Sequence, residues 1–185
     1  MNPIQSILTS VINVLNENKI EHLLIGGHAV NYYGYSRFTS DIDFMLVLRD
    51  TNDFVRIMNQ AGFTVYDVQP QVVFLKTPDV PVRVDFLRVD PETFAKLMDS
   101  AVAATVMQNT VKVPSLNNLL AMKFHSLAQS NLRRVKDLDD IVGLSLKNNV
   151  DVETILRPFA IKYATEQIYQ LVCTAMQSGQ DKQPS

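Results

Sequence analysis

The segment that most constrains the fold is residues 23–48, which read LLIGGHAVNYYGYSRFTSDIDFMLVL. Within it, Asp41 and Asp43 flank Ile42, and the chain continues as an apolar run. Residues two apart on a strand point to the same face, so both carboxylates would project together while Ile42 points into the core. Carboxylates held that close repel each other unless a cation neutralises them. The spacing therefore predicts a strand that carries an acidic site on one face.

A third acid lies on another predicted strand. The segment VPVRVDFLRV, residues 80–89, alternates in polarity and carries Asp85 near its middle. If this strand lies beside the first, Asp85 completes a cluster of three carboxylates with Asp41 and Asp43. Such an oxygen-rich cluster suits Mg²⁺ or Mn²⁺, which take carboxylates together with substrate phosphates, and a triad of this kind can hold two metal ions. Asp85 would then help to activate an acceptor, through the metal or as a general base.

Four further residues are candidates for binding phosphate. Gly26 and Gly27 end a predicted strand, His22–Ile25, and precede a short predicted helix, His28–Tyr33. Glycine lets the backbone approach a phosphate closely, and N–H groups exposed there favour anions. Arg37 and Thr39 come shortly before the acid pair, and we predict that they reach the same phosphates.

Each of these features also has an ordinary interpretation, because short motifs match by chance. The D-I-D strand would have a solvated outer face, the glycine pair would be a simple turn, and Asp85 would be a surface acid. Arg37 and Thr39 would be loop residues. The order of the elements favours the functional interpretation, since strand, glycine turn, helix, arginine loop, acidic strand and second acidic strand follow one another.

The remaining pattern predicts an α+β fold with a mixed sheet and flanking helices, followed by a helical lobe. One helix is expected to open at Asn2-Pro3, with an apolar stripe that runs to Leu15, and another to open at Asp90-Pro91 and to carry Phe94, Leu97 and Met98. A helix is also expected to about residue 61 from a cap at Asp50 or Thr51, and strands over 40–48, 63–68, 72–76 and 82–88, with a weak strand pair within 101–113. After Pro114 only helices are expected, near 115–129, 134–147, 151–162 and 164–177. We therefore predict a core over residues 1–113, a C-terminal helical lobe over 114–177 and a disordered tail over 178–185.

Composition limits the classes of function. The net charge of −2 argues against a broad nucleic-acid-binding face, although a local patch is compatible with it. The single cysteine, Cys173, excludes an internal disulfide and fits a reducing compartment. Polar residues interrupt the N-terminal apolar stripe, and no segment approaches the roughly 20 apolar residues of a membrane span. We expect a cytoplasmic protein with no membrane partner.

The run GGHAVNYYGYSRFTSDIDFML resembles the signature of the nucleotidyltransferase superfamily, which has the DNA polymerase beta-like fold. Its detailed form is similar to small bacterial members and to AbiEii-type toxins of toxin–antitoxin pairs. The resemblance implies Mg²⁺ and an NTP donor. It also implies that Asp41 and Asp43 are the metal-binding pair, that Asp85 is the third acid, and that the Gly26-Gly27 turn contacts phosphates. Many superfamily members have serine where this chain has Gly27.

A second resemblance lies in the helical lobe, where the sequence from Ala121 onward is similar to a K-x-x-A…R-x-K-D-x-x-D pattern of the toxin-like members. It implies that Lys123 faces the nucleotide phosphates and that Asp137 lines the same site, although Ser126 occupies the alanine position. The alternative is that this charged helix face is merely solvated, since Lys136 and Asp140 form an ordinary i, i+4 pair.

Together these features predict a metal-dependent nucleotidyltransferase that moves NMP from an NTP to an acceptor. The acceptor is left open between a tRNA end, a protein hydroxyl and a small molecule. The resemblance adds the hypothesis of a toxin with a cognate antitoxin, and a homodimer could supply a missing wall of the site. The competing hypothesis is a non-catalytic nucleotide- or partner-binding module with the same fold.

Overall fold

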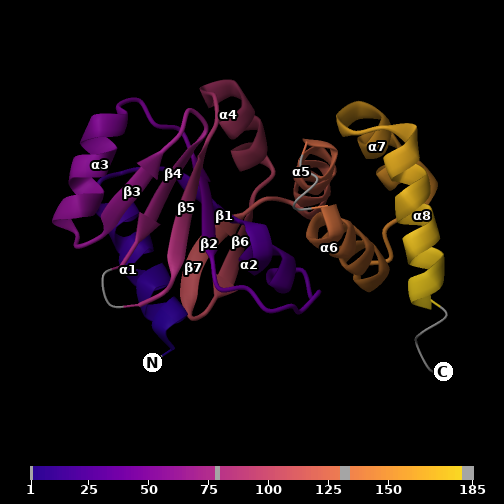
Figure 1. The fold of residues 1–185 in the computed structure, drawn as a ribbon, viewed down its shortest axis with the longest axis horizontal. Coiled ribbons are helices and arrows are strands. Elements are labelled where there is room, and N and C mark those ends of the chain that lie inside the picture. The colour runs from indigo at the N-terminus through magenta and orange to yellow at the C-terminus, as the bar shows by residue number, and fades with distance from the viewer. Residues whose placement is uncertain (1, 78–79, 130–133, 181–185) are drawn as a thin grey trace. The chain divides into compact units, whose positions relative to one another are not determined.

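The computed structural model describes residues 2–77, 80–129 and 134–180. The chain forms two compact units, one made of Met1–Ala29 with Arg37–Ser115 and the other of Val30–Ser36 with Leu116–Ser185. The first unit is a mixed sheet with helices and the second is helical (Figure 1). The predicted α+β class is therefore confirmed. Nothing in the periodicity indicates that residues 30–36 belong with the second unit.

The first unit is built on a five-stranded sheet with the order β1-β2-β5-β4-β3. Its strands are β1 (His22–Ile25), β2 (Ile42–Leu46), β3 (Thr64–Val68), β4 (Val72–Lys76) and β5 (Arg83–Arg88). β2 and β5 run parallel, whereas the other neighbouring pairs are antiparallel. The sheet is therefore mixed, and its parallel pair joins the strands that carry Asp43 and Asp85.

Helices and a hairpin complete this unit. They are α1 (Pro3–Glu17), α3 (Thr51–Gln60), α4 (Pro91–Asp99) and the hairpin of β6 (Val102–Val106) and β7 (Asn109–Val113). α1 begins where the side chain of Asn2 accepts a hydrogen bond from the N–H of Ile4 at 3.0 Å, and Pro3 occupies the first turn. Figure 1 shows α3 beside β3 and the hairpin next to β1.

Aromatic packing fixes the register of the two acidic strands. Phe44 on β2 and Phe86 on β5 are paired across the ladder, and their rings stack at 5.6 Å. Phe54 of α3 meets Phe86 edge-on at 5.0 Å, and all three side chains are buried. Because successive residues of a strand point to opposite faces, burial of these rings turns Asp43 and Asp85 to the other face of the sheet.

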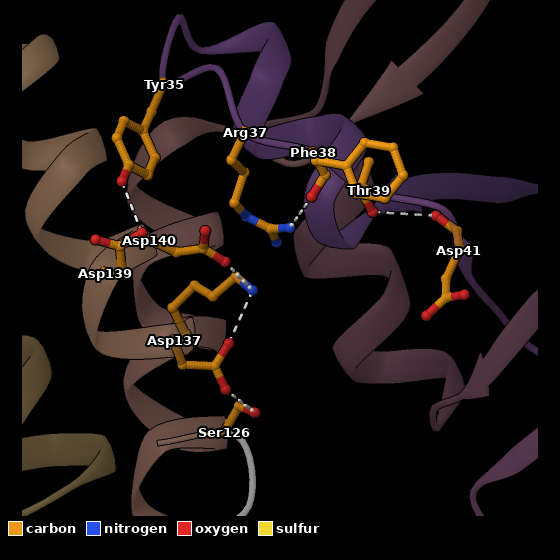
Figure 2. A network of polar contacts seen from close by, with 10 residues as sticks. Tyr35, Arg37, Phe38, Thr39, Asp41, Ser126, Asp137, Asp139 and Asp140 are labelled. Atoms are coloured by element: carbon orange, nitrogen blue, oxygen red, sulfur yellow. Dashed lines mark hydrogen bonds and ion pairs between the residues drawn. The ribbon is translucent and has the colours of Figure 1, made fainter. Parts of the chain in front are cut away.

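The second unit contains α5 (Leu116–Gln129), α6 (Arg134–Lys147), η1 (Val152–Leu156), α7 (Arg157–Tyr163) and α8 (Glu166–Gln180). Segment 30–36 is held to this unit by contacts with α6 and with Asn148, which follows it. The hydroxyl of Tyr35 donates to Asp139 at 2.7 Å (Figure 2), and Nδ2 of Asn148 donates to the carbonyl of Tyr33 at 3.0 Å. A Cβ at Gly143 would overlap the Tyr35 ring, so the absence of a side chain there lets the ring lie against the helix.

Several predicted boundaries differ from the structure. β2 is shorter than the strand predicted over 40–48, so Asp41 lies just before it. α2 spans Gly26–Tyr32, so the helix begins at the glycine pair and not at His28. The helix expected over 151–162 is split into η1 and α7, because Pro158 has no N–H to donate to the preceding turn. α8 continues to Gln180, past Ser178, where the sequence predicts that order ends, and residues 181–185 lie outside the described part. No helix among the described residues is long and apolar enough to cross a membrane.

Candidate active site

The parallel pair of β2 and β5 brings two of the predicted acids opposite each other. Asp43 is the register partner of Asp85, and Ile42 is the partner of Val84. The sequence could only assume that these strands are neighbours, and the structure confirms it. Asp85 is 5 % exposed, so its interpretation as an ordinary surface acid is wrong.

Arg83 links Asp85 to the third acid, Asp41. Its Nη2 donates to Oδ2 of Asp41 at 2.9 Å, and its Nε lies 2.9 Å from Oδ1 of Asp85 as an ion pair that lacks hydrogen-bond alignment. Partial burial disfavours the charged guanidinium, but Asp85 and Asp41 outweigh this effect and raise the pKa of Arg83. A positive charge is therefore already held on the face where the acids meet.

The loop before β2 supports Asp41 with further donors. Oγ of Ser40 donates to Oδ1 of Asp41 at 3.3 Å, and Oγ1 of Thr39 donates to the backbone carbonyl of Asp41 at 3.4 Å (Figure 2). Nη1 of Arg37 donates to the carbonyl of Phe38 at 3.3 Å, and the Phe38 ring is 87 % exposed. The loop thus orders the backbone next to the acid while its aromatic side chain faces water.

Gly26 lies directly against Asp43. Its φ of +63° is a conformation that favours glycine, and an added Cβ would lie 2.6 Å from Cγ and 2.9 Å from Cβ of Asp43. Both the backbone and the neighbouring carboxylate therefore require glycine here.

Gly27 provides room for two other predicted residues. A Cβ at Gly27 would lie 2.6 Å from Oγ1 of Thr39 and 3.0 Å from Nη1 of Arg37. The Thr39 hydroxyl and the Arg37 guanidinium therefore lie close to the glycine turn, and their contact with phosphate stays a prediction. The serine that many superfamily members have at this position would collide with Thr39 as the structure places it.

His28 follows the glycine pair and is almost fully buried, at 2 % exposed. Burial disfavours the charged imidazolium and lowers the pKa of His28. The negative charge of Asp43 acts in the opposite direction, but it does not outweigh burial and the positive charge of Arg37. Nε2 of His28 has no hydrogen-bond partner among the described residues. A neutral imidazole therefore lies beside the acidic face.

The acids match a divalent cation in chemistry and in charge. Asp41, Asp43 and Asp85 supply carboxylate oxygens, the donors that Mg²⁺ and Mn²⁺ prefer. Three carboxylates and the one guanidinium of Arg83 leave two negative charges, which one divalent cation would balance. In the described part of the chain, no three His, Cys, Asp or Glu side chains are yet arranged to hold a metal ion. Arg83 instead occupies positions on Asp41 and Asp85 that a metal would need.

The second unit contains a separate ionic cluster. Nζ of Lys123 lies 2.9 Å from Oδ1 of Asp137 and 2.7 Å from Oδ2 of Asp140, and Oγ of Ser126 donates to Oδ2 of Asp137 at 2.7 Å. Figure 2 shows Ser126 and Asp137 joined in this way. Asp137 and Asp140 are 3 % and 0 % exposed, so the interpretation of this helix face as merely solvated is wrong for both.

Two residues of these clusters were not singled out as site residues from the sequence. Arg83 shares a strand face with Asp85, two positions away, and Ser126 follows Lys123 by one helical turn. Both spacings are visible in the sequence. The spacings do not identify the neighbouring strand or helix that brings each side chain into a cluster.

The family comparison is consistent with this geometry. Residues 4–169 match the model of a family described as nucleotidyl transferase of unknown function, DUF2204. The chain belongs to this family. No curated protein matches it significantly.

Solved nucleotidyltransferases share the fold. The antibiotic-resistance factor ANT(2″)-Ia, in complex with adenylyl-2″-tobramycin, is 14 % identical with a TM-score of 0.66, covering 86 % of this chain and 98 % of that one. The lincosamide antibiotic adenylyltransferase LnuA, with lincomycin bound, is 15 % identical with a TM-score of 0.54, covering 78 % and 96 %. An antigenic nucleotidyltransferase-like protein from Paracoccidioides brasiliensis is 15 % identical with a TM-score of 0.55, covering 96 % and 89 %. At these identities the likeness concerns the fold alone.

Proposed function

We propose that this nucleotidyl transferase family member is a metal-dependent enzyme that transfers NMP from an NTP to a hydroxyl of an acceptor. The observation that carries the proposal is the pairing of Asp43 with Asp85 across β2 and β5, with Asp41 joined to Asp85 through Arg83. The fit of this donor set to Mg²⁺ or Mn²⁺, in oxygen chemistry and in charge, supports a metal there. When bound, the metal would neutralise phosphate charge and lower the pKa of the acceptor hydroxyl.

The remaining roles follow from position. Asp41 and Asp43 would hold the metal together with the NTP phosphates, and Asp85 would hold it or take the proton of the acceptor hydroxyl. Gly26 and Gly27 leave the turn beside Asp43 without side chains, so phosphate oxygens can approach its backbone. Arg37 and Thr39 approach the same turn and would supply donors to the triphosphate.

The nucleotide-binding role of Lys123 and Asp137 stays a prediction. The ammonium of Lys123 is shared by two buried carboxylates, which supports a structural role at least as well.

The neighbours in fold support the reaction class but not the acceptor. The name adenylyl-2″-tobramycin describes a nucleotide joined to an antibiotic, and LnuA is named as an adenylyltransferase. By analogy, the donor here is a nucleoside triphosphate and the product is a nucleotidylated hydroxyl compound. A role as the toxin of a toxin–antitoxin pair stays a separate prediction.

One observation favours the non-catalytic alternative, namely that Arg83 already pairs with two of the three acids. The test is calorimetric titration of the four NTPs with and without Mg²⁺, using wild type and Asp43→Asn. We expect wild type to bind NTP only with Mg²⁺ and Asp43→Asn to lose that binding while its circular dichroism is unchanged. Asp53→Asn, which changes an exposed acid on α3, is the matched control and should bind as wild type does.

Two results would contradict the proposal. One is a folded wild-type protein that binds no NTP in Mg²⁺ or Mn²⁺, which would favour a partner-binding module. The other is an Asp43→Asn variant with wild-type affinity, which would place the nucleotide elsewhere.

A further inference from the structure

The chain leaves the glycine turn and returns to it after a short excursion, residues 28–36. At the end of the excursion, Arg37 brings Nη1 to a point 3.0 Å from where a Cβ of Gly27 would lie. Thr39 brings Oγ1 to 2.6 Å from the same point. The excursion therefore begins and ends at one place in the first unit.

Most of the excursion nevertheless belongs to the second unit. Residues 30–36 cluster with Leu116–Ser185, whereas Ala29 and Arg37, which flank them, belong to the first unit. The chain thus passes between the units at the links 29–30 and 36–37. α2 crosses the first of these links as a continuous helix, since it spans Gly26–Tyr32.

One stripe of α6 holds the excursion. Asp139, Gly143 and Lys147 are spaced by four residues, so they lie on the same side of the helix. Asp139 accepts the hydrogen bond of the Tyr35 hydroxyl at 2.7 Å (Figure 2), and a Cβ at Gly143 would overlap the Tyr35 ring. A Cβ at Gly34 would lie 3.3 Å from Cγ and Cε of Lys147. We call these three residues of α6 the α6 stripe.

The stripe and the excursion are adjusted to each other in backbone as well as in side chains. Gly34 has a φ of +87°, which favours glycine. Nδ2 of Asn148, the residue after α6, donates to the carbonyl of Tyr33 at 3.0 Å. Glycine is unfavourable in the middle of a helix compared with alanine, so its presence at position 143 needs a reason. The ring of Tyr35 supplies one, because any side chain there would displace it.

We propose that the α6 stripe is a positioning surface, which holds the middle of the excursion and so keeps Arg37 and Thr39 at the glycine turn. This inference rests on the proposed transferase function, in which Arg37 and Thr39 supply donors to the triphosphate. Tyr35 and the stripe do not touch the nucleotide and act through the chain at the 36–37 link. The excursion thereby makes the affinity for NTP depend on the helical unit.

A fluorescent reporter tests the inference without any ligand. The chain has no tryptophan, and Phe38, between Arg37 and Thr39, is 87 % exposed. Phe38→Trp therefore places a single fluorophore in the loop, and this variant is the parent of all the others. The anisotropy decay of the fluorophore reports motion of the loop on the nanosecond timescale.

Two substitutions release the excursion from α6. Gly143→Ala forces the Tyr35 ring away from the helix, and Tyr35→Ala removes the ring. We expect each to increase the amplitude of the fast anisotropy decay and to weaken Mg²⁺–NTP binding, measured by calorimetry, about tenfold, as loss of one charge-assisted hydrogen bond does. Tyr35→Phe, which keeps the ring, should have a smaller effect than Tyr35→Ala.

A double variant and a second glycine provide the controls. In the Tyr35→Ala background, Gly143→Ala should cause no further loss, because no ring is left to displace. Gly62→Ala introduces backbone strain at φ +88° where an added Cβ meets no atom within 4 Å. It should lower stability and leave both the anisotropy decay and the NTP affinity at the level of the parent.

Three results would overturn the inference. They are an unchanged anisotropy decay in Gly143→Ala and Tyr35→Ala, a mobile loop that binds NTP as tightly as the parent does, and equal effects of Gly62→Ala, which would indicate general destabilisation. A wild-type protein that binds no NTP in Mg²⁺ or Mn²⁺ is a different result. It would contradict the proposed function, whereas the anisotropy decay would still decide whether the α6 stripe holds the loop.

Discussion

Replacing Gly26 with alanine should affect both stability and ligand binding. A residue with a side chain loses roughly 1–2 kcal/mol in the left-handed region where Gly26 lies, at φ +63°. The new methyl group would also lie within 2.6 Å of Cγ and 2.9 Å of Cβ of Asp43. Rotation of the carboxylate cannot relieve the second contact, because Cβ is fixed by the strand backbone. β2 or the glycine turn must therefore move, and Asp43 moves with it.

Gly62 provides a matched control for the cost of backbone strain. It has φ +88° and an added Cβ would meet no atom within 4 Å, so Gly62→Ala tests conformational strain alone. We expect Gly62→Ala to lose about 1–2 kcal/mol of unfolding free energy, or roughly 2–8 °C in Tm, and to keep NTP binding. Gly26→Ala should lose more than Gly62→Ala and should bind Mg²⁺–NTP at least about tenfold more weakly, because a displacement of about 1 Å is costly in a site of this kind.

The measurements are thermal or guanidinium unfolding followed by circular dichroism, and calorimetry with Mg²⁺ and NTP. Equal destabilisation of the two variants, with NTP binding intact in both, would refute the reasoning. It would mean that the contact between Gly26 and Asp43 does not constrain the acidic strand.

Two further predictions concern buried charges. Lys123→Met should destabilise the helical unit by about 3–5 kcal/mol in denaturant unfolding, because it leaves Asp137 and Asp140 buried without their shared cation; a stable variant that only loses NTP binding would favour a nucleotide-binding role instead. Burial lowers the pKa of His22, although its hydrogen bond to Ile20 acts in the opposite direction. The unfolded chain therefore binds a proton at His22 at a higher pH than the folded chain does, as pH falls below about 6.5. Stability should therefore be unaffected by His22 above that pH and decline below it, by at most about 1.4 kcal/mol per pH unit, and His22→Asn should remove this share of the slope between pH 7.5 and 5.5.

Much of the fold could be predicted because it depends on local patterns. Capping residues and apolar stripes located the helices to within a few residues, as Asn2-Pro3 did for α1 and Asp50 did for α3. The alternation around Asp43 and Asp85 predicted the strand face that carries each of them, whereas Asp41 lies just before β2. These signals act over a few residues, and the structure preserves them.

The second-unit cluster could not be predicted with the same certainty because it depends on packing between helices. On α6 alone, Asp137 and Asp140 are three residues apart and look like part of a solvated charged face. The packing of α5 against α6 brings Lys123 and Ser126 to that face, where Asp137 and Asp140 are buried. Helical periodicity gives the direction of a side chain, but whether that direction leads to water or to another helix is a property of the tertiary fold.

Arg83 likewise cannot be recognised from the sequence, because one of its partners is distant in the chain. Strand parity places Arg83 on the face of Asp85, but its effect depends on Asp41, which lies 42 residues earlier in the chain. Without a cation, three carboxylates on one face would repel one another and weaken the parallel pair that holds them. Arg83 offsets this repulsion from within the same strand, so the sheet can form before a metal binds. Under the proposed function, a metal on Asp41 and Asp85 would take over that task and release the guanidinium of Arg83 from both carboxylates.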